Sequence, residues 1–137
     1  MKTLITALTT FAACQAVRKK LDDPARPDAE YAKGRLRLTA LRNEGAAFGL
    51  PIPMKTVLSV SAVGLGLLWR RRRKAPVSTG LVLGGGLSNL LERVREGEVY
   101  DYVQFPDAPG KLRDYVFNLA DFAVFSGAVG LLLRGKR

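Results

Sequence analysis

Apolar residues gather in four segments of this chain, separated by stretches rich in charge. The segments cover residues of about 3–17, 51–69, 75–91 and 115–133. A helix that crosses a membrane needs about 17–25 mostly apolar residues. The third and fourth segments reach that length, and the first two can span if flanking lysine and arginine side chains extend to the interface. The pattern predicts an all-α membrane protein, a bundle of four transmembrane helices forming one domain over residues 1–137.

Glycine spacing and a short alternating stretch add detail to this bundle. Gly80 and Gly84 have the GxxxG spacing that is typical of closely packed helices in membranes. Residues 34–42 alternate polar and apolar side chains, which is the period of a strand with one wet face. We therefore expect a small sheet on the membrane surface, within the loop of about 18–50. A second loop is expected over about 92–114.

Positive charge predicts how the bundle is oriented. The net charge is +10, and basic residues cluster at the ends of apolar segments, in residues 70–74 and 134–137. Short loops rich in lysine and arginine stay in the cytoplasm. Residues 18–50 are also basic, against this rule, but the turn at 70–74 is denser. We expect both termini in the cytoplasm and the two longer loops outside. Membrane lipid is the expected partner, and no nucleic-acid motif accompanies the charge.

The scarcity of nucleophiles and metal ligands narrows the possible chemistry. The chain has no histidine and a single cysteine, Cys14. An internal disulfide is impossible, and zinc sites and Ser-His or Cys-His catalysis lose their usual residues. We expect no metal and no cofactor. If the chain is an enzyme, carboxylates are the remaining candidates for catalysis.

One carboxylate lies inside the last apolar segment. Asp121 is the only charged residue between positions 115 and 133, and such a charge costs a few kcal/mol in a membrane. It lies about two turns into that segment. Asp101 follows Gly97, which permits a sharp turn, so a loop could bring the two carboxylates together. Such a pair shares a proton: one member takes a proton from water, and the other polarises a scissile carbonyl.

Simpler interpretations of these residues stay open on spacing alone. Asp121 is also suited to the first turn of a helix, if the last helix begins later than residue 115. Asp101 fits an ordinary loop acid. Asn89, Glu92 and Arg93 share one helical face, where the last two fit a solvated pair at a helix end.

Four motifs follow one another along the chain: Asn43-Glu-Gly45-Ala-Ala-Phe48, Ser88-Asn89-Leu-Leu-Glu92-Arg93, Val99-Tyr-Asp101-Tyr102 and Phe117-Asn118-Leu-Ala-Asp121. In order and spacing they resemble the motifs of the lipoprotein signal peptidase family, also called signal peptidase II. The resemblance covers essentially the whole chain. It implies an intramembrane aspartic endopeptidase of the bacterial cytoplasmic membrane. That enzyme cleaves diacylglyceryl-modified prolipoproteins before the acylated cysteine.

The resemblance also implies roles for individual residues. Asp101 and Asp121 fall on the two catalytic positions, and the strand at 34–42 on an extracytoplasmic β-cradle. Positions that support the carboxylates or hold the substrate correspond to Gln15, Asn43, Gly45, Phe48, Asn89, Glu92, Arg93 and Asn118.

Four positions depart from the family pattern. Cys14 and Glu92 stand where the family has aspartate, Val17 stands where it has threonine, and Ser88 stands where it has glycine. Two alternatives therefore remain. The chain could be a catalytically impaired paralogue that binds lipidated peptides, or a lipoprotein anchored at Cys14.

Overall fold

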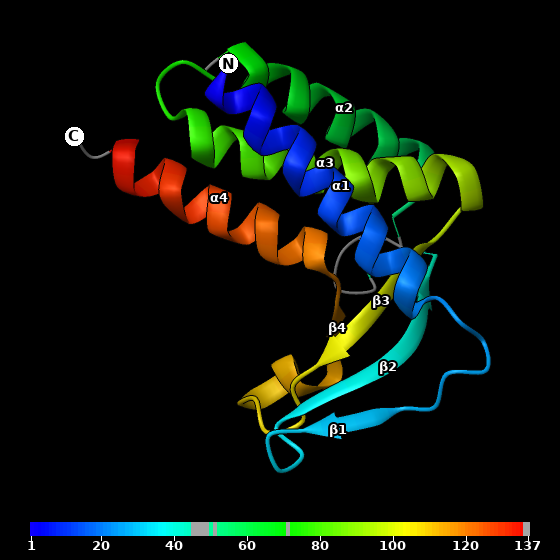
Figure 1. The fold of residues 1–137 in the computed structure, drawn as a ribbon. Helices are drawn as coiled ribbons and strands as arrows, with labels where there is room; N and C mark the ends of the chain where they lie inside the picture. The colour runs from blue at the N-terminus through cyan, green and yellow to red at the C-terminus, as the bar shows by residue number, and fades with distance from the viewer. Residues whose placement is uncertain (45–49, 51, 71, 136–137) are drawn as a thin grey trace.

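Four helices form a bundle, and a small antiparallel sheet lies beyond one end of it (Figure 1). The computed structural model describes residues 1–44, 50, 52–70 and 72–135. The helices are α1 (Lys2–Leu21), α2 (Met54–Arg70), α3 (Pro76–Glu96) and α4 (Leu119–Gly135). The strands are β1 (Ala29–Tyr31), β2 (Leu36–Asn43), β3 (Val99–Gln104) and β4 (Val116–Phe117), in that order across the sheet. The four helices and the small sheet that the sequence predicts are confirmed.

The helices overlap the four apolar segments but do not share their boundaries. α1 continues through Lys19 and Lys20, and α3 continues to Glu96. Lysine, arginine and glutamate are good helix formers, so a helix need not stop where its apolar sequence stops. α3 ends at Gly97, whose φ of 77° is left-handed, and the chain turns there into β3. Within the described residues, no helix has both the length and the apolar character of a membrane span.

α3 packs against each of the other helices, and its glycines make this possible. A methyl group on Gly84 would meet a carbonyl oxygen of α1 at 2.5 Å, and one on Gly85 would meet a carbonyl oxygen of α4 at 2.6 Å. Gly80 faces α1 in the same way. The predicted close packing at Gly80 and Gly84 is confirmed, because neither site has room for a side chain.

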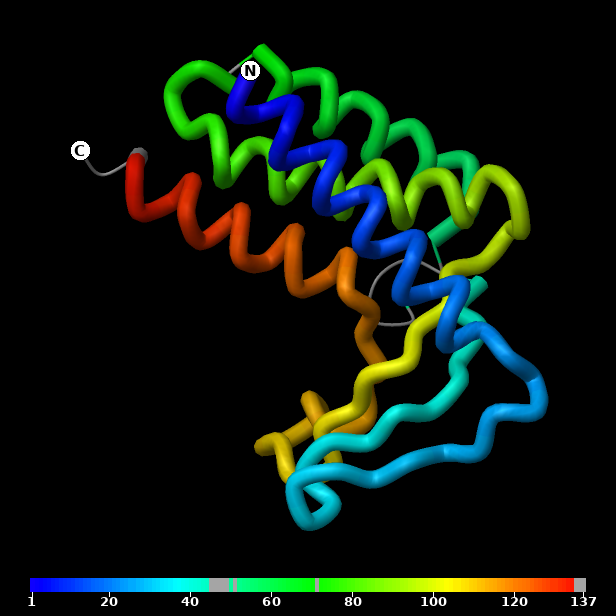
Figure 2. The backbone as a smooth tube through the Cα atoms, viewed as in Figure 1, coloured from blue at the N-terminus to red at the C-terminus, as the bar shows by residue number. Residues whose placement is uncertain are grey.

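The sheet contains the predicted strand and three more. β2 covers residues 36–43, close to the alternating stretch at 34–42, and it pairs with β1 and β3. Residues 92–114, expected as a connection between the third and fourth apolar segments, carry regular structure over much of their length. α3 and β3 occupy residues 92–96 and 99–104, and a 3-10 helix follows at Gly110–Asp114. Figure 2 shows the start of α1, the α2–α3 connection and the end of α4 at the opposite end of the bundle from this sheet.

Candidate active site

The two aspartates singled out in the sequence lie where the sheet meets the helices. Asp101 is on β3, not on a loop as expected. Asp121 is in the first turn of α4, not two turns into a helix, because α4 begins only at Leu119. Residues 116–117, which continue the apolar sequence upstream, form β4 instead. The simpler interpretation of Asp121 as a helix-terminal charge therefore describes its location correctly.

Two local devices fix the start of α4. Asn118 Oδ1 accepts a hydrogen bond from the Asp121 backbone N–H at 3.0 Å, and Asp121 Oδ2 accepts one from the Asn118 backbone N–H at 2.9 Å. This reciprocal pair is a capping box, with asparagine and aspartate in the two roles. Phe117 and Phe122 pack across it with ring centroids 6.0 Å apart, as in a hydrophobic staple. The Asp121 carboxylate therefore has a defined position.

Asparagine side chains connect the two carboxylates. Asn118 Nδ2 donates to Asp101 Oδ1 at 2.8 Å and to Asn89 Oδ1 at 3.0 Å. Asn89 Nδ2 in turn donates to Asp121 Oδ1 at 3.0 Å. Asp101 Oδ2 accepts from Asn43 Nδ2 at 3.2 Å. The sheet explains this last contact, because Asn43 pairs with Val99 and therefore lies diagonally across from Asp101 on one face.

Burial makes the charge on Asp101 costly. Its side chain belongs to a residue only 4% exposed. Burial, and after it the charge of Asp121, raises the pKa of Asp101 to about 7, although Asn43, Asn118 and Arg93 act in the opposite direction. Near neutral pH, Asp101 can therefore hold or release a proton, as a general acid or base requires.

Glu92 is not the solvated helix-end acid that the simpler interpretation describes. It is 5% exposed, and its Oε2 accepts the Tyr100 backbone N–H at 3.1 Å. The same oxygen lies 3.3 Å from Arg18 Nε. Glu92, on α3, thus contacts both α1 and β3. Its contact on β3 is Tyr100, the residue before Asp101. Arg93 donates to the Asn89 carbonyl oxygen at 3.3 Å, and its charge acts on Asp101.

Gln15 is not hydrogen-bonded to either carboxylate. Gln15 Nε2 donates to Ser88 Oγ at 2.9 Å, next to Asn89 in the sequence. Cys14 is buried, 3% exposed. Gly45 and Phe48 lie outside the described residues.

Tyr102 is a structural contributor to which the sequence reasoning gave no role. Its hydroxyl oxygen accepts the backbone N–H of Leu119 at 2.9 Å, which ties β3 to the start of α4. Burial raises the pKa of Tyr102 to about 12, so the phenol stays neutral. The run of β-branched and aromatic residues Val-Tyr-Asp-Tyr-Val at 99–103 is a strand signal that could have revealed this element.

The arrangement suits acid–base chemistry. Two carboxylates with shared hydrogen-bond partners, one with a pKa near neutrality, can divide a single proton between them. Among the described residues, no group of three or more histidine, cysteine, aspartate or glutamate side chains could hold a metal ion.

Known proteins resemble this chain in both sequence and fold. A family profile described as Signal peptidase (SPase) II matches residues 4–135. A lipoprotein signal peptidase from Halothermothrix orenii is 38% identical over 104 residues, covering 70% of this chain and 67% of that protein. One from Syntrophomonas wolfei is 39% identical over 116 residues, covering 77% of this chain and 74% of that protein.

A solved structure shares the fold. It is described as a bacterial membrane enzyme determined by the in meso method, and it superposes with a TM-score of 0.82 at 23% identity, covering 96% of this chain and 85% of its own. The matches to the first four curated relatives span 53% to 67% of their lengths.

Proposed function

Since the chain belongs to the signal peptidase II family, we propose that it is an intramembrane aspartic endopeptidase. Its substrates are diacylglyceryl-modified prolipoproteins, from which it removes the signal peptide before the acylated cysteine. Asp101 and Asp121 are the catalytic pair. Asn43, Asn89 and Asn118 position them.

The observation that carries this proposal is that one residue, Asn118, donates hydrogen bonds to both carboxylates in a buried site. Asn118 donates its side-chain N–H to Asp101 and its backbone N–H to Asp121. The pKa of Asp101, raised to about 7 by burial and by the charge of Asp121, suits the member that carries the proton. Asp121 suits the ionised member, because the N-terminus of α4 stabilises negative charge.

The reaction follows from these two states. Asp121 takes a proton from water, and the resulting hydroxide oxygen attacks the scissile carbonyl carbon. Protonated Asp101 donates a hydrogen bond to the carbonyl oxygen, where negative charge develops, and then gives its proton to the leaving nitrogen. The amide bond breaks, which leaves a carboxyl group at the end of the signal peptide and a free α-amino group on the diacylglyceryl-modified cysteine. The two carboxylates exchange protonation states over the cycle, so apparent pKa values belong to the pair.

Exposed apolar side chains on all four helices support a membrane location. They are Leu4, Ile5 and Leu8 on α1, Val60, Val63 and Leu67 on α2, Val77 and Leu87 on α3, and Phe125, Leu132 and Leu133 on α4. So many exposed apolar side chains on every helix are typical of contact with lipid or protein. We propose that the helices cross the bacterial cytoplasmic membrane, with the sheet outside and both termini in the cytoplasm. The basic turn after α2 lies at the end opposite the sheet, as this orientation requires.

Cys14 argues against the lipoprotein alternative. Its residue is 3% exposed within α1, so acylation of the thiol would require α1 to leave the bundle. Ser88, which replaces glycine of the family pattern, is fully buried and accepts a hydrogen bond from Gln15. These departures therefore lie in packed positions beside the carboxylates.

A cleavage assay with matched substrates tests the proposal. The purified chain in detergent is mixed with one precursor peptide in two forms, with and without diacylglyceryl on the cysteine, and the products are identified by mass. We expect cleavage before the cysteine in the lipidated form only. Binding of the lipidated peptide without cleavage would instead identify the catalytically impaired paralogue. Equal cleavage of both peptides would contradict the substrate assignment.

A further inference from the structure

The two ends of this molecule differ in how their positive charges are balanced. Every Asp and Glu lies within residues 22–44 or 92–121, and none lies in residues 1–21, 45–91 or 122–137. At the sheet end, arginines pair with carboxylates: Arg18 contacts Glu92 and Glu96, and Arg37 contacts Glu30. The segments at the opposite end contain no aspartate or glutamate. Among the described residues, none of its cations makes an ion pair; they are Lys2, Arg70, Arg72, Arg73, Lys74 and Arg134.

A pocket of about 450 Å³ lies among these cations. Lys2, Arg72, Arg73 and Trp69 line it, together with Pro76 at the start of α3. α1 and α3 both begin here, and neither has an acidic residue in its first turn or a side-chain cap. The partial positive charges of two helix N-termini therefore add to those of the side chains.

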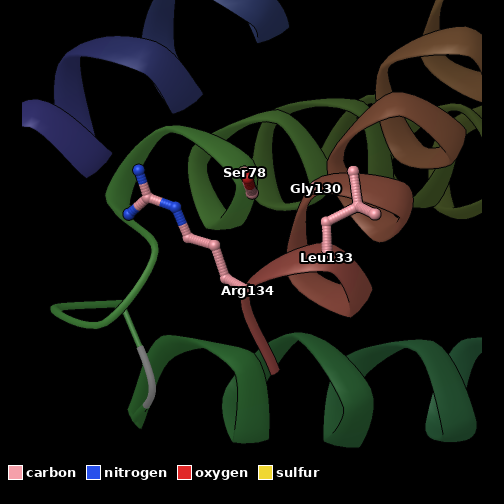
Figure 3. A pocket seen from close by; sticks show the side chains of 4 residues that line it. All are labelled: Ser78, Gly130, Leu133 and Arg134. Atoms are coloured by element: carbon pink, nitrogen blue, oxygen red, sulfur yellow. The ribbon is translucent and has the colours of Figure 1, made fainter. Parts of the chain in front are cut away.

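The connection that carries the cations is held in place from several sides. Thr3 Oγ1 donates to the Arg72 carbonyl oxygen at 3.1 Å. The Arg72 guanidinium lies 4.3 Å from the Trp69 ring centroid and donates to the Trp69 carbonyl oxygen at 2.9 Å. Arg134 Nη1 donates to the Lys74 carbonyl oxygen at 3.3 Å. Figure 3 shows the Arg134 side chain extending from the end of α4 towards the start of α3, beside Ser78 and a second pocket.

We propose that this basic pocket, made of Lys2, Trp69, Arg72 and Arg73, binds the phosphate of an anionic phospholipid headgroup. The inference shares the membrane location with the proposed function and is independent of peptide cleavage. Guanidinium groups fit phosphate oxygens in pairs, and the lysine adds a mobile point charge.

Apolar surface beside the pocket favours a lipid over a soluble phosphate. Leu4 lines the pocket and is 50% exposed, and Leu67 and Val77, near it in sequence on α2 and α3, are 60% and 53% exposed. Trp69 has an amphipathic ring of the kind enriched at the level of lipid headgroups. A phospholipid satisfies both features, because its phosphate meets the cations while its acyl chains cover the apolar side chains. Basic pockets between helices on the cytoplasmic side bind anionic headgroups in this way.

Trp69 is the only tryptophan of the chain, so its fluorescence reports on this pocket alone. The full chain in detergent micelles is titrated with phosphatidylglycerol or with phosphatidylcholine, each carrying brominated acyl chains that quench tryptophan. We expect phosphatidylglycerol to quench Trp69 at lower mole fractions than phosphatidylcholine does, and high salt to remove the difference. Equal quenching by both lipids would overturn the proposal.

A charge-matched pair of variants identifies the residues. Lys2→Gln with Arg73→Gln should weaken binding of phosphatidylglycerol about thirtyfold, since each cation near an anionic headgroup contributes about 1 kcal/mol. Arg95→Gln with Lys111→Gln removes the same charge from exposed positions near the sheet and should change binding less than about twofold, within the scatter of additive surface effects. Equal weakening in both variants would mean that net charge alone attracts the lipid, and the pocket would be excluded.

Two further arms separate the possible outcomes. Glycerol phosphate added without lipid should not displace phosphatidylglycerol; displacement at comparable concentrations would assign the pocket to a soluble phosphate. Asp101→Asn should keep the lipid preference even where cleavage is lost, and Lys2→Gln with Arg73→Gln should still cleave. Failure of the pocket and failure of the peptidase proposal are thereby distinguishable.

Discussion

Asn118 serves both carboxylates, and two substitutions separate its roles. Its side-chain oxygen caps α4, and its side-chain N–H groups hold Asp101 and Asn89. Asn118→Ser keeps a capping oxygen and loses the amide donor. Asn118→Ala loses both. A comparison of the two variants therefore isolates the hydrogen bond to Asp101 from the stability of the helix.

The expected magnitudes follow from these contacts. Serine and asparagine cap helices about equally well, and replacing a cap with alanine costs about 1 kcal/mol. Asn118→Ala should therefore be less stable than Asn118→Ser by about that amount in thermal unfolding. Both variants lose a donor 2.8 Å from Asp101. Asp101 becomes charged as it gives its proton to the leaving nitrogen. A hydrogen bond to a charged group contributes about 1.5–3 kcal/mol, so kcat/KM should fall by about 10- to 150-fold in both variants.

The pH profile distinguishes a chemical role from a merely structural one. The Asn118 hydrogen bond favours ionised Asp101, so its loss should raise the pKa of Asp101 beyond the present value of about 7. Because protonated Asp101 is the proposed acid, activity falls as pH rises through this pKa. The alkaline limb of kcat/KM, measured with a fluorogenic lipopeptide, should move to higher pH in both variants. An unmoved limb, or one moved to lower pH, would refute the reasoning.

Three further predictions concern packing, charge and pH. Gly84→Ala should lower the free energy of unfolding by about 1–3 kcal/mol, because its methyl group would meet a carbonyl oxygen of α1 at 2.5 Å. Gly64→Ala meets nothing within 4 Å and should not lower it; thermal melts in detergent measure both. Glu92→Gln should cost about 1.5–3 kcal/mol in the same assay, because Arg18 loses its buried partner; an unchanged melt would contradict this. The pKa of Asp101 is about 7 in the folded protein and has its ordinary value of 3.8 in the unfolded chain. Between these two pH values, Asp101 therefore holds more protons in the folded protein than in the unfolded chain. Stability should therefore decline as pH rises through that window, and Asp101→Asn should remove this part of the decline.

Hydropathy was sufficient to predict the four helices, and motif order singled out the two aspartates. Neither predicted that Asp101 lies on a strand or that Asp121 lies in the first turn of a helix. Val99, Tyr100, Asp101 and Tyr102 are all buried, because β3 is covered by helix ends as well as by neighbouring strands. The alternation that identifies a half-exposed strand is therefore missing. β2 is more exposed to solvent, and the alternation of polar and apolar residues along it was visible in the sequence.

The start of α4 was misplaced for a related reason. Apolar sequence continues without a break from β4 into α4, so hydropathy does not mark the boundary. The capping box of Asn118 and Asp121 does mark it, and that local signal was available in the sequence. The contact between Arg18 and Glu92 was not available, because only the packing of α1 against α3 brings these residues together.

The central claim is that Asp101 and Asp121 act together in cleavage, and single aspartate-to-asparagine variants test it most directly. Each substitution keeps the size of the side chain and removes its proton chemistry. Purified Asp101→Asn and Asp121→Asn are compared with Asp107→Asn, an exposed control, on the lipidated precursor. We predict that each of the first two lowers the cleavage rate by about 100- to 10,000-fold while the protein stays in the membrane fraction, and that the control cleaves normally. Cleavage at the normal rate by either Asp101→Asn or Asp121→Asn would contradict the account.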